Sequence, residues 1–258
     1  MEINKQMLLP YLMYSDPIVY NENITLYPVT MKDILKFQLL SQSFTIRKNS
    51  TFREKKLIKM TYLDLLIYCF EKEEIEEQYK IHGLSHFYLF AFQLLMMCCK
   101  DAEIKFSTDN GYFIINGEII TPQIFDDLRR IIIIQNDIDF DIDEFLNYDT
   151  EQKLLNAKKK MDINKEPSNI EDYIDSLAVA LKTTEQEIKN MTIRKFWRYF
   201  KRYRLHEQYT ILKTGECSGL VKFKEPIKDW IISIEVTDKY ADLKTDENEL
   251  KGKIRDAN

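Results

Sequence analysis

The residues with the most obvious chemical potential lie in the run RKFWRYFKRYR (194–204), where basic and aromatic residues are interleaved. Such a mixture can bind phosphates through its cations and stack nucleic-acid bases on its rings. Helical spacing, however, places Phe196, Trp197 and Phe200 on one face, which favours burial of these rings in a core. The other face carries the residues that we predict to contact a partner: Arg194, Lys195, Arg198, Lys201 and Arg202.

Two patterns resemble metal sites, but both depart from the known spacing. His82 and His86 lie four residues apart, yet Gly83 stands between them and no third ligand is spaced nearby. Three alternating acids resemble the start of an EF-hand loop: Asp137, Asp139 and Asp141. The sixth and twelfth positions of that loop would be Ile142 and Tyr148 instead of Gly and Glu. We therefore expect no metal.

Nucleophilic catalysis is not indicated either. The segment GECSG (215–219) puts Ser218 at the wrong position for a nucleophile elbow. Cys217 and His206 could act as nucleophile and base, but no carboxylate is placed to orient the histidine. Glycine-rich loops for phosphates or dinucleotides are missing from the sequence. We expect a protein that is not an enzyme and needs no cofactor.

Composition favours a helical protein that works in the cytoplasm. The 258 residues include only 6 Gly and 6 Pro, and the net charge of -5 gives no overall attraction to nucleic acid or anionic membranes. The apolar runs are too short to span a membrane, and the N-terminus lacks the apolar core of a signal peptide. The four cysteines have no zinc-type spacing, which predicts reduced thiols: Cys69, Cys98, Cys99 and Cys217.

Periodicity and turn signals predict an α+β, predominantly helical fold. In chain order we expect a β-hairpin at 18–27, helices at 30–40 and 55–70, a buried helix at 85–99, three short strands at 104–107, 112–115 and 118–120, and a helix opened by Thr121-Pro122. Met31, Ile34, Leu35 and Leu39 are predicted to face inward from the 30–40 helix.

The second part of the chain predicts a small helical unit. Ser168 with Glu171 forms a capping box for one helix, and Thr192 caps the basic helix. For the short helix between them, Thr183 with Gln186 and Thr184 with Glu187 offer two overlapping caps. None of these helices can bury its stripe alone, so they must pack together. A loop is expected at 215–219. The predicted domains are an N-terminal α+β domain at 1–149, a linker at 150–167, a C-terminal helical domain at 168–236 and a polar tail at 237–258.

Several segments together resemble tailed-phage and prophage proteins of low-GC Gram-positive bacteria. They are LPYL (9–12), ITLYPVTMKDIL (24–35), KMTYLDLL (59–66), NGYFIINGEIIT with FDDLRRIIIIQN (110–136), and MTIRKFW with SGLVKFKEPIKDWI (191–231). Such proteins are commonly encoded in the tail module, and the closest role that the resemblance implies is tail assembly chaperone. The N-terminal α+β part is larger than in the small, all-helical chaperones.

The resemblance implies a non-enzymatic protein that binds the tape-measure protein during tail assembly, with a possible homo-oligomer. Two alternatives remain open from the residues. One is a nucleic-acid-binding regulator that uses the basic helix at 192–205, which the core spacing of the aromatics disfavours. The other is a structural component of the virion.

Overall fold

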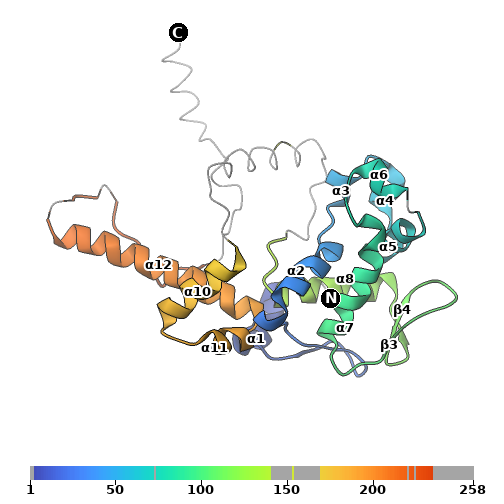
Figure 1. Ribbon diagram of the computed structural model, residues 1–258, viewed down its shortest axis with the longest axis horizontal. Coiled ribbons are helices and arrows are strands. Elements are labelled where there is room, and N and C mark those ends of the chain that lie inside the picture. The colour runs from blue at the N-terminus through green and yellow to red at the C-terminus, as the bar shows by residue number, and fades with distance from the viewer. Residues whose placement is uncertain are drawn as a thin grey trace, which may run out of the picture. The chain divides into compact units, whose positions relative to one another are not determined.

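The computed structural model describes residues 3–72, 74–140, 153, 169–219, 221–223 and 225–234 (Figure 1). Its contacts divide the chain into two compact units, Met1–Glu144 with Tyr173–Phe200 and Phe145–Asp172 with Lys201–Asn258. The described residues form the predominantly helical α+β fold that the sequence predicts. The predicted linker at 150–167, except Lys153, and the predicted tail at 237–258 lie outside the described residues, so the domain boundaries stay predictions.

The predicted N-terminal hairpin is confirmed, and an asparagine builds its turn. β1 (Ile18–Val19) pairs antiparallel with β2 (Thr25–Leu26). The Asn21 side chain accepts hydrogen bonds from the backbone N–H groups of Asn23 and Ile24, at 3.0 and 2.9 Å. This local bonding fixes the turn that the sequence Asn-Glu-Asn predicts.

The predicted three-stranded meander is also confirmed. β3 (Ile104–Phe106), β4 (Phe113–Ile115) and β5 (Glu118–Ile119) lie in that order, each antiparallel to its neighbour. Asn116 and Gly117 join β4 to β5 with φ of 48° and 83°. A tight hairpin turn requires positive φ at both central residues, which Asn-Gly supplies at low cost.

Helices make up most of the described residues. The α-helices are α1 (Lys5–Tyr14), α2 (Ile34–Ser41), α3 (Lys48–Thr51), α4 (Lys55–Lys59), α5 (Tyr62–Glu71), α6 (Ile75–Tyr79), α7 (Phe87–Cys98), α8 (Pro122–Gln135), α10 (Ile170–Leu181), α11 (Glu185–Asn190) and α12 (Ile193–Cys217), and short 3₁₀ turns lie at Met31–Asp33, Gln42–Phe44 and Leu84–His86. As predicted, α7 is central: it contacts α2 and α5, and Ala91, Leu94 and Leu95 are fully buried. No described helix is long and apolar enough to cross a membrane.

The buried face of α2 differs from the prediction. Met31 and Ile34 are buried as expected, but Leu35 and Leu39 are 66% and 50% exposed. Phe37 and Leu40 are buried in their place, so the buried positions recur every third residue from 31 to 40. The 3₁₀ turn that opens this segment has three residues per turn, which favours that spacing. The sequence of this helix contains two apolar stripes, and tertiary packing determines that the one with Phe37 and Leu40 is buried.

Two predicted boundaries are wrong. The helix expected at 55–70 is two helices, because Met60 is extended and the Thr61 hydroxyl caps α5 by accepting from the backbone N–H of Asp64. The loop expected at 215–219 is helical as far as Cys217. Lys213 pairs with Glu216 at 2.8 Å in this last turn, which supports the helix in spite of its glycine.

The caps of the C-terminal helices follow local sequence signals. Thr184 and Glu187 form the predicted capping box of α11. The Thr192 hydroxyl accepts from the backbone N–H of Lys195 at 3.3 Å, as predicted for the basic helix. At α10 the side chain of Asn169 accepts from the backbone N–H of Asp172 at 2.8 Å. Asn169 therefore caps this helix, one residue after the predicted Ser168.

A short antiparallel bridge joins two distant parts of the first unit, and we call it the Thr30–Thr192 junction (residues 29–31 and 191–193). The backbone N–H of Met31 donates to the carbonyl of Met191 at 2.8 Å, and that of Ile193 donates to the carbonyl of Val29 at 2.9 Å. These bonds attach the start of α12 to the chain that leads into α2. Nothing in the local sequence predicts them.

Asn136 anchors the same junction to the end of α8. This side chain is 1% exposed, and its Oδ1 accepts from the backbone N–H of Val29 at 2.9 Å. Its Nδ2 donates to the carbonyl of Ile132 at 2.9 Å. Ser15, at the end of α1, adds a hydroxyl–hydroxyl bond of 3.0 Å to Thr192.

Replacing Asn136 therefore tests the junction. We expect Asn136→Ala to destabilise the protein by about 2 kcal/mol, because the buried N–H of Val29 loses its acceptor. Urea unfolding of the full chain measures the change. Asn190→Ala, at an exposed position of α11, is the matched control and should stay close to wild type. Equal stability of the two variants would contradict the anchoring role.

Candidate partner-binding surfaces

The aromatic residues of the basic helix are packed, as their spacing predicts. Phe196 is fully buried. Trp197 meets Phe196 and Tyr173 edge-on, with ring centroids 5.1 and 5.2 Å apart. Phe200 meets Tyr173 in the same way at 5.0 Å. Rings held in these contacts have edges and faces already occupied, so they are poorly placed to stack on nucleic-acid bases.

Arg194 does not lie on an open basic face. Its side chain is 5% exposed, and its Nη1 lies 3.4 Å from Oδ1 of Asp137, which is 17% exposed. Tertiary packing turns Arg194 toward the end of α8, so its side chain is buried and not on the exposed face of the helix. Its charge serves the fold, since a buried cation needs a partner of opposite sign.

Arg202 also has an internal role. Its guanidinium donates to the backbone carbonyls of Trp230 and Ile232, the second at 2.9 Å. The indole of Trp230 packs edge-on against His206, with centroids 5.0 Å apart. Arg202 therefore fastens the segment that follows α12 back onto the helix. His206, considered as a base for Cys217, is instead part of this packing.

The remaining three basic candidates reach the surface. Lys201 is exposed, and Lys195 and Arg198 are partly exposed. The ammonium of Lys195 lies 5.7 Å from the centre of the Tyr199 ring. The structure therefore divides the five predicted basic residues into two groups. Arg194 and Arg202 make contacts within the fold, and Lys195, Arg198 and Lys201 reach the surface.

The patterns that resembled metal sites have other roles. Within the described ranges, no group of three or more His, Cys, Asp or Glu residues is placed to hold a metal. Asp137 pairs with Arg194, and Asp141 lies outside the described residues. His86 lies 3.5 Å from Glu76.

Glu76 organises the loop before α7. Its carboxylate accepts from the Ser85 hydroxyl and from the backbone N–H groups of Gly83 and Ser85, both at 3.1 Å. These bonds, with the Ser85 hydroxyl first, lower the pKa of Glu76 to about 2. The nearby histidine therefore belongs to a structural loop contact.

The cysteines are free thiols, and three of them are buried. Burial raises the pKa of Cys69 and of Cys99 to about 12, and it raises the pKa of Cys98 as well. Cys217, at the end of α12, is exposed. Because the thiolate is the reactive form, the three buried thiols should be inert in the folded protein.

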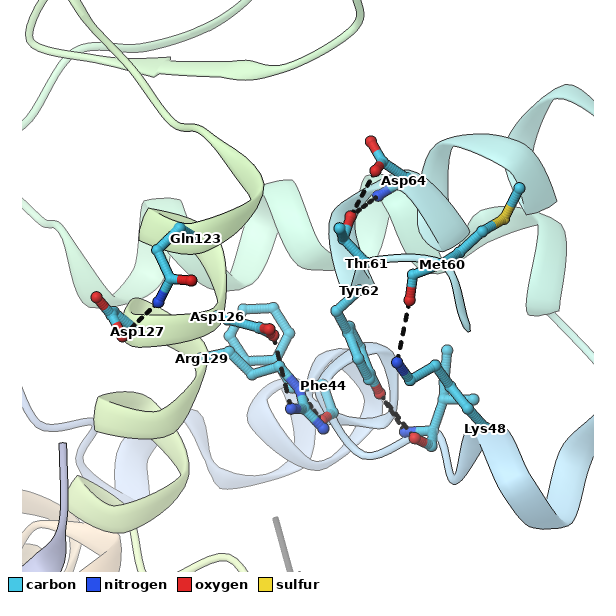
Figure 2. Close-up of polar contacts among 11 residues, drawn as sticks. Phe44, Lys48, Met60, Thr61, Tyr62, Asp64, Gln123, Asp126, Asp127 and Arg129 are labelled. Atoms are coloured by element: carbon cyan, nitrogen blue, oxygen red, sulfur yellow. Dashed lines mark hydrogen bonds and ion pairs between the residues drawn. The ribbon is translucent and has the colours of Figure 1, made fainter. Parts of the chain in front are cut away.

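One buried cation was missed by sequence reasoning altogether. Figure 2 shows Arg129 of α8 lying against the ring of Tyr62, 3.7 Å from its centre. The Arg129 Nε donates to the carbonyl of Phe44 at 2.7 Å, and Asp126 lies 3.9 Å from Nη1. The Tyr62 hydroxyl in turn bonds both backbone groups of Ile46. This cluster ties α5 and α8 to the loop after α2.

Helices α1 and α2 are among the described helices of the first unit that expose large apolar side chains. On α2 these are Leu35 and Leu39. On α1 they are Met7, Leu9, Tyr11, Met13 and Tyr14, each at least 42% exposed. Exposed apolar patches on soluble proteins commonly mark interaction sites. No sequence signal separates Leu40, which is buried, from the two outer leucines of α2, because both apolar stripes have spacings that a helix can bury.

These features define a predominantly helical α+β protein whose described residues include exposed apolar and basic side chains. Residues 157–235 match the family described as YomV second domain, a segment of less than a third of the chain. No curated protein and no solved structure matches the chain. The match is to a phage-derived family, so it supports a phage or prophage protein in general.

The two kinds of basic residue on α12 should respond differently to substitution. We expect Arg194→Met to lower the free energy of unfolding by about 3 kcal/mol, because the partly buried Asp137 loses its cation. Lys195→Met, one residue away and partly exposed, is the matched control and should change it by less than about 0.5 kcal/mol. Chemical denaturation of both variants checks this difference. Similar stabilities would refute the structural role of Arg194.

Thiol reactivity provides a second measurement. At pH 8 we expect the folded protein to react quickly with Ellman's reagent at Cys217 and slowly at the other three cysteines, whose pKa values are raised by burial. Denaturation in guanidinium should make all four thiols react. Cys217→Ser should remove the fast phase, and a fast phase that persists in this variant would contradict the assignment.

Proposed function

We propose that this protein is a non-enzymatic phage tail assembly protein, a chaperone that binds amphipathic helical segments of the tape-measure protein during tail morphogenesis. Such a role needs a soluble acidic protein with helical faces that accept apolar side chains. The family match at 157–235 supports the phage origin, and the resemblance of segments throughout the chain supports the tail module.

The observation that carries the proposal is the outer face of α2. Leu35 and Leu39 lie four residues apart, so they stand one above the other on this helix. Lys32 and Lys36, both exposed, fall on the same side at helical spacing. Two apolar anchors flanked by cations are the complement of a helix with an apolar stripe and acidic edges. Helix-to-helix recognition commonly uses anchors at this spacing.

Lys195 of α12 gives the same partner a second contact. This partly exposed cation would meet a further acidic residue, whereas Arg194 and Arg202 hold the fold. Charged pairs at the edge of an interface contribute mainly to the rate and specificity of association. Affinity should therefore depend more on the leucines of α2 than on this cation.

Binding to a tape-measure fragment tests the proposal directly. We expect the full chain to keep a co-expressed acidic, amphipathic tape-measure fragment soluble and to copurify with it. The double change Leu35→Glu and Leu39→Glu should abolish copurification, since it places acids against acids and removes the apolar anchors. Val179→Glu replaces another exposed aliphatic residue on a helix, 80% exposed on α10, and should leave binding intact.

The charge-reversed variant Lys195→Glu should weaken copurification at low salt more than at high salt. A wild-type protein that neither binds nor solubilises the fragment refutes the chaperone. Binding that survives the double leucine change refutes the α2 face as its site.

Two competing functions make different predictions. A nucleic-acid-binding regulator would be retained on DNA at low salt and released as salt rises, and reversal of Lys195 and Lys201 would abolish retention without unfolding the protein. A structural virion component would be found in purified particles by mass spectrometry. A chaperone should be absent from those particles.

A further inference from the structure

The three-stranded sheet of the first unit has an open edge at β3, the outer strand in the order β3-β4-β5. Lys105 and Phe106 of this strand are exposed. The opposite edge strand, β5, is tied through the carboxylate of Glu118 to the side chains of Asn21 and Asn23 in the turn of the first hairpin. The family match at 157–235 does not cover the β3 edge, and the proposed function does not use it.

The hydrogen bonds to β4 show which backbone groups of β3 face the open edge. The carbonyl of Glu103 accepts from the N–H of Asn116 at 2.9 Å, and the N–H of Ser107 donates to the chain that enters β4 at 2.7 Å. Successive residues of a strand turn their N–H and C=O groups to alternate sides. Ile104 and Phe106 therefore turn theirs away from β4. Backbone groups presented in this way are a template for another strand.

The charges of β3 indicate which strand fits this edge. Glu103 and Lys105 are exposed on the same face of the strand, with Oε1 and Nζ 2.7 Å apart. An edge lysine alone discourages pairing with another strand. Here an acid and a base flank Ile104, so the edge is complementary to a second copy of itself. If two β3 strands run antiparallel with Ile104 opposite Ile104, each Glu103 faces the Lys105 of the other copy.

The backbone suits the same register. The two Ile104 residues would exchange both of their N–H···O=C bonds, as a hydrogen-bonded pair of an antiparallel ladder does. Glu103 and Lys105 would then form non-hydrogen-bonded pairs, in which the Cα atoms are about 4.5 Å apart and the side chains lie closer. Opposite charges in such pairs stabilise a sheet, and like charges destabilise it. A register centred on Lys105 would place two lysines opposite each other.

Apolar side chains lie beside this edge on the other face of β3. Phe106 is 42% exposed, and its ring stacks on Phe92 of α7 with centroids 4.1 Å apart. Met96, one turn further along α7 on the same side of the helix, is 52% exposed. Burial of these side chains would add to the main-chain hydrogen bonds, which provide affinity when a strand is added to a sheet.

We propose that the open edge of β3 pairs antiparallel with β3 of a second copy of this chain, in the register that sets Glu103 opposite Lys105. The pairing joins two three-stranded sheets into one continuous sheet. An interface built on one short strand from each copy is small, so the dimer dissociates on dilution. This inference is independent of the tape-measure proposal, which uses α2 and α12.

Charge reversal on either side of Ile104 tests the dimer and its register, measured by sedimentation velocity of the full chain over a concentration series. We expect the wild type to change from monomer to dimer as concentration rises. Glu103→Lys and Lys105→Glu, each alone, should weaken self-association by about tenfold or more, because like charges then face each other. An equimolar mixture of the two variants should form a heterodimer, since one strand is then basic and the other acidic. A chain that carries both reversals should dimerise like wild type.

Two matched controls reverse exposed charges on other elements, Glu77→Lys on α6 and Lys59→Glu on α4, and should dimerise normally. A wild type that stays monomeric, a single reversal at β3 that dimerises like wild type, or a mixture that stays monomeric would overturn the proposal. A dimer that is abolished by Leu35→Glu with Leu39→Glu, and not by the β3 reversals, would assign self-association to α2 and would also overturn it.

A disulfide locates the register even if the charge variants fold poorly. In a Cys217→Ser background, Ile104→Cys should form a covalent dimer under mild oxidation, because residues in a hydrogen-bonded pair have Cα atoms about 5.5 Å apart, within reach of a disulfide. Lys105→Cys in the same background should react much more slowly, since it faces position 103 of the other copy. Equal rates, or faster reaction of Lys105→Cys, would refute the proposed register.

Discussion

The packing of the first unit depends on the antiparallel bridge between Thr30 and Thr192. A buried backbone group without a partner costs about as much as a lost hydrogen bond, so both sides of the bridge are held together strongly. Asn136 satisfies the neighbouring N–H of Val29, and Ser15 bonds the hydroxyl of Thr192. The ends of α1 and α8, the chain before α2 and the start of α12 are thereby positioned by one set of polar contacts. The exposed faces of α1 and α2 owe their presentation to it.

Local signals explain which parts of this fold are predictable. The Asn-Gly turn at 116–117, the Thr184–Glu187 capping box and the proline that opens α8 act within a few residues, so the sequence alone reveals them. The inner face of α2 depends on tertiary packing with residues far away in the sequence. Periodicity identified the helices, but it could not predict which of the two apolar faces of α2 is buried.

In the basic run of α12, the sequence likewise does not show which charged side chains are buried. Arg194 and Lys195 are adjacent in a basic run, and no propensity scale distinguishes a cation that pairs with Asp137 from one that reaches solvent. The role of Arg129 is even harder to predict from the sequence, since its stacking on Tyr62 and its hydrogen bond to Phe44 involve three separate elements. Arginine suits such positions because its planar guanidinium can stack and donate at once. A basic run therefore identifies a helix with cations, and only the tertiary structure shows which of them are buried and which reach the surface.

The apolar residues exposed on α1 and α2 differ in the charges beside them. Lys5 is the only charged residue of α1, whereas Lys32 and Lys36 are exposed beside Leu35 and Leu39. A face that selects another protein gains specificity from charges that repel the wrong partner, and the lysines beside Leu35 and Leu39 would oppose pairing of two α2 helices. The protein as a whole has a net charge of -5 and would repel an acidic partner. A local group of cations, such as these lysines, would attract an acidic segment to one place on the surface.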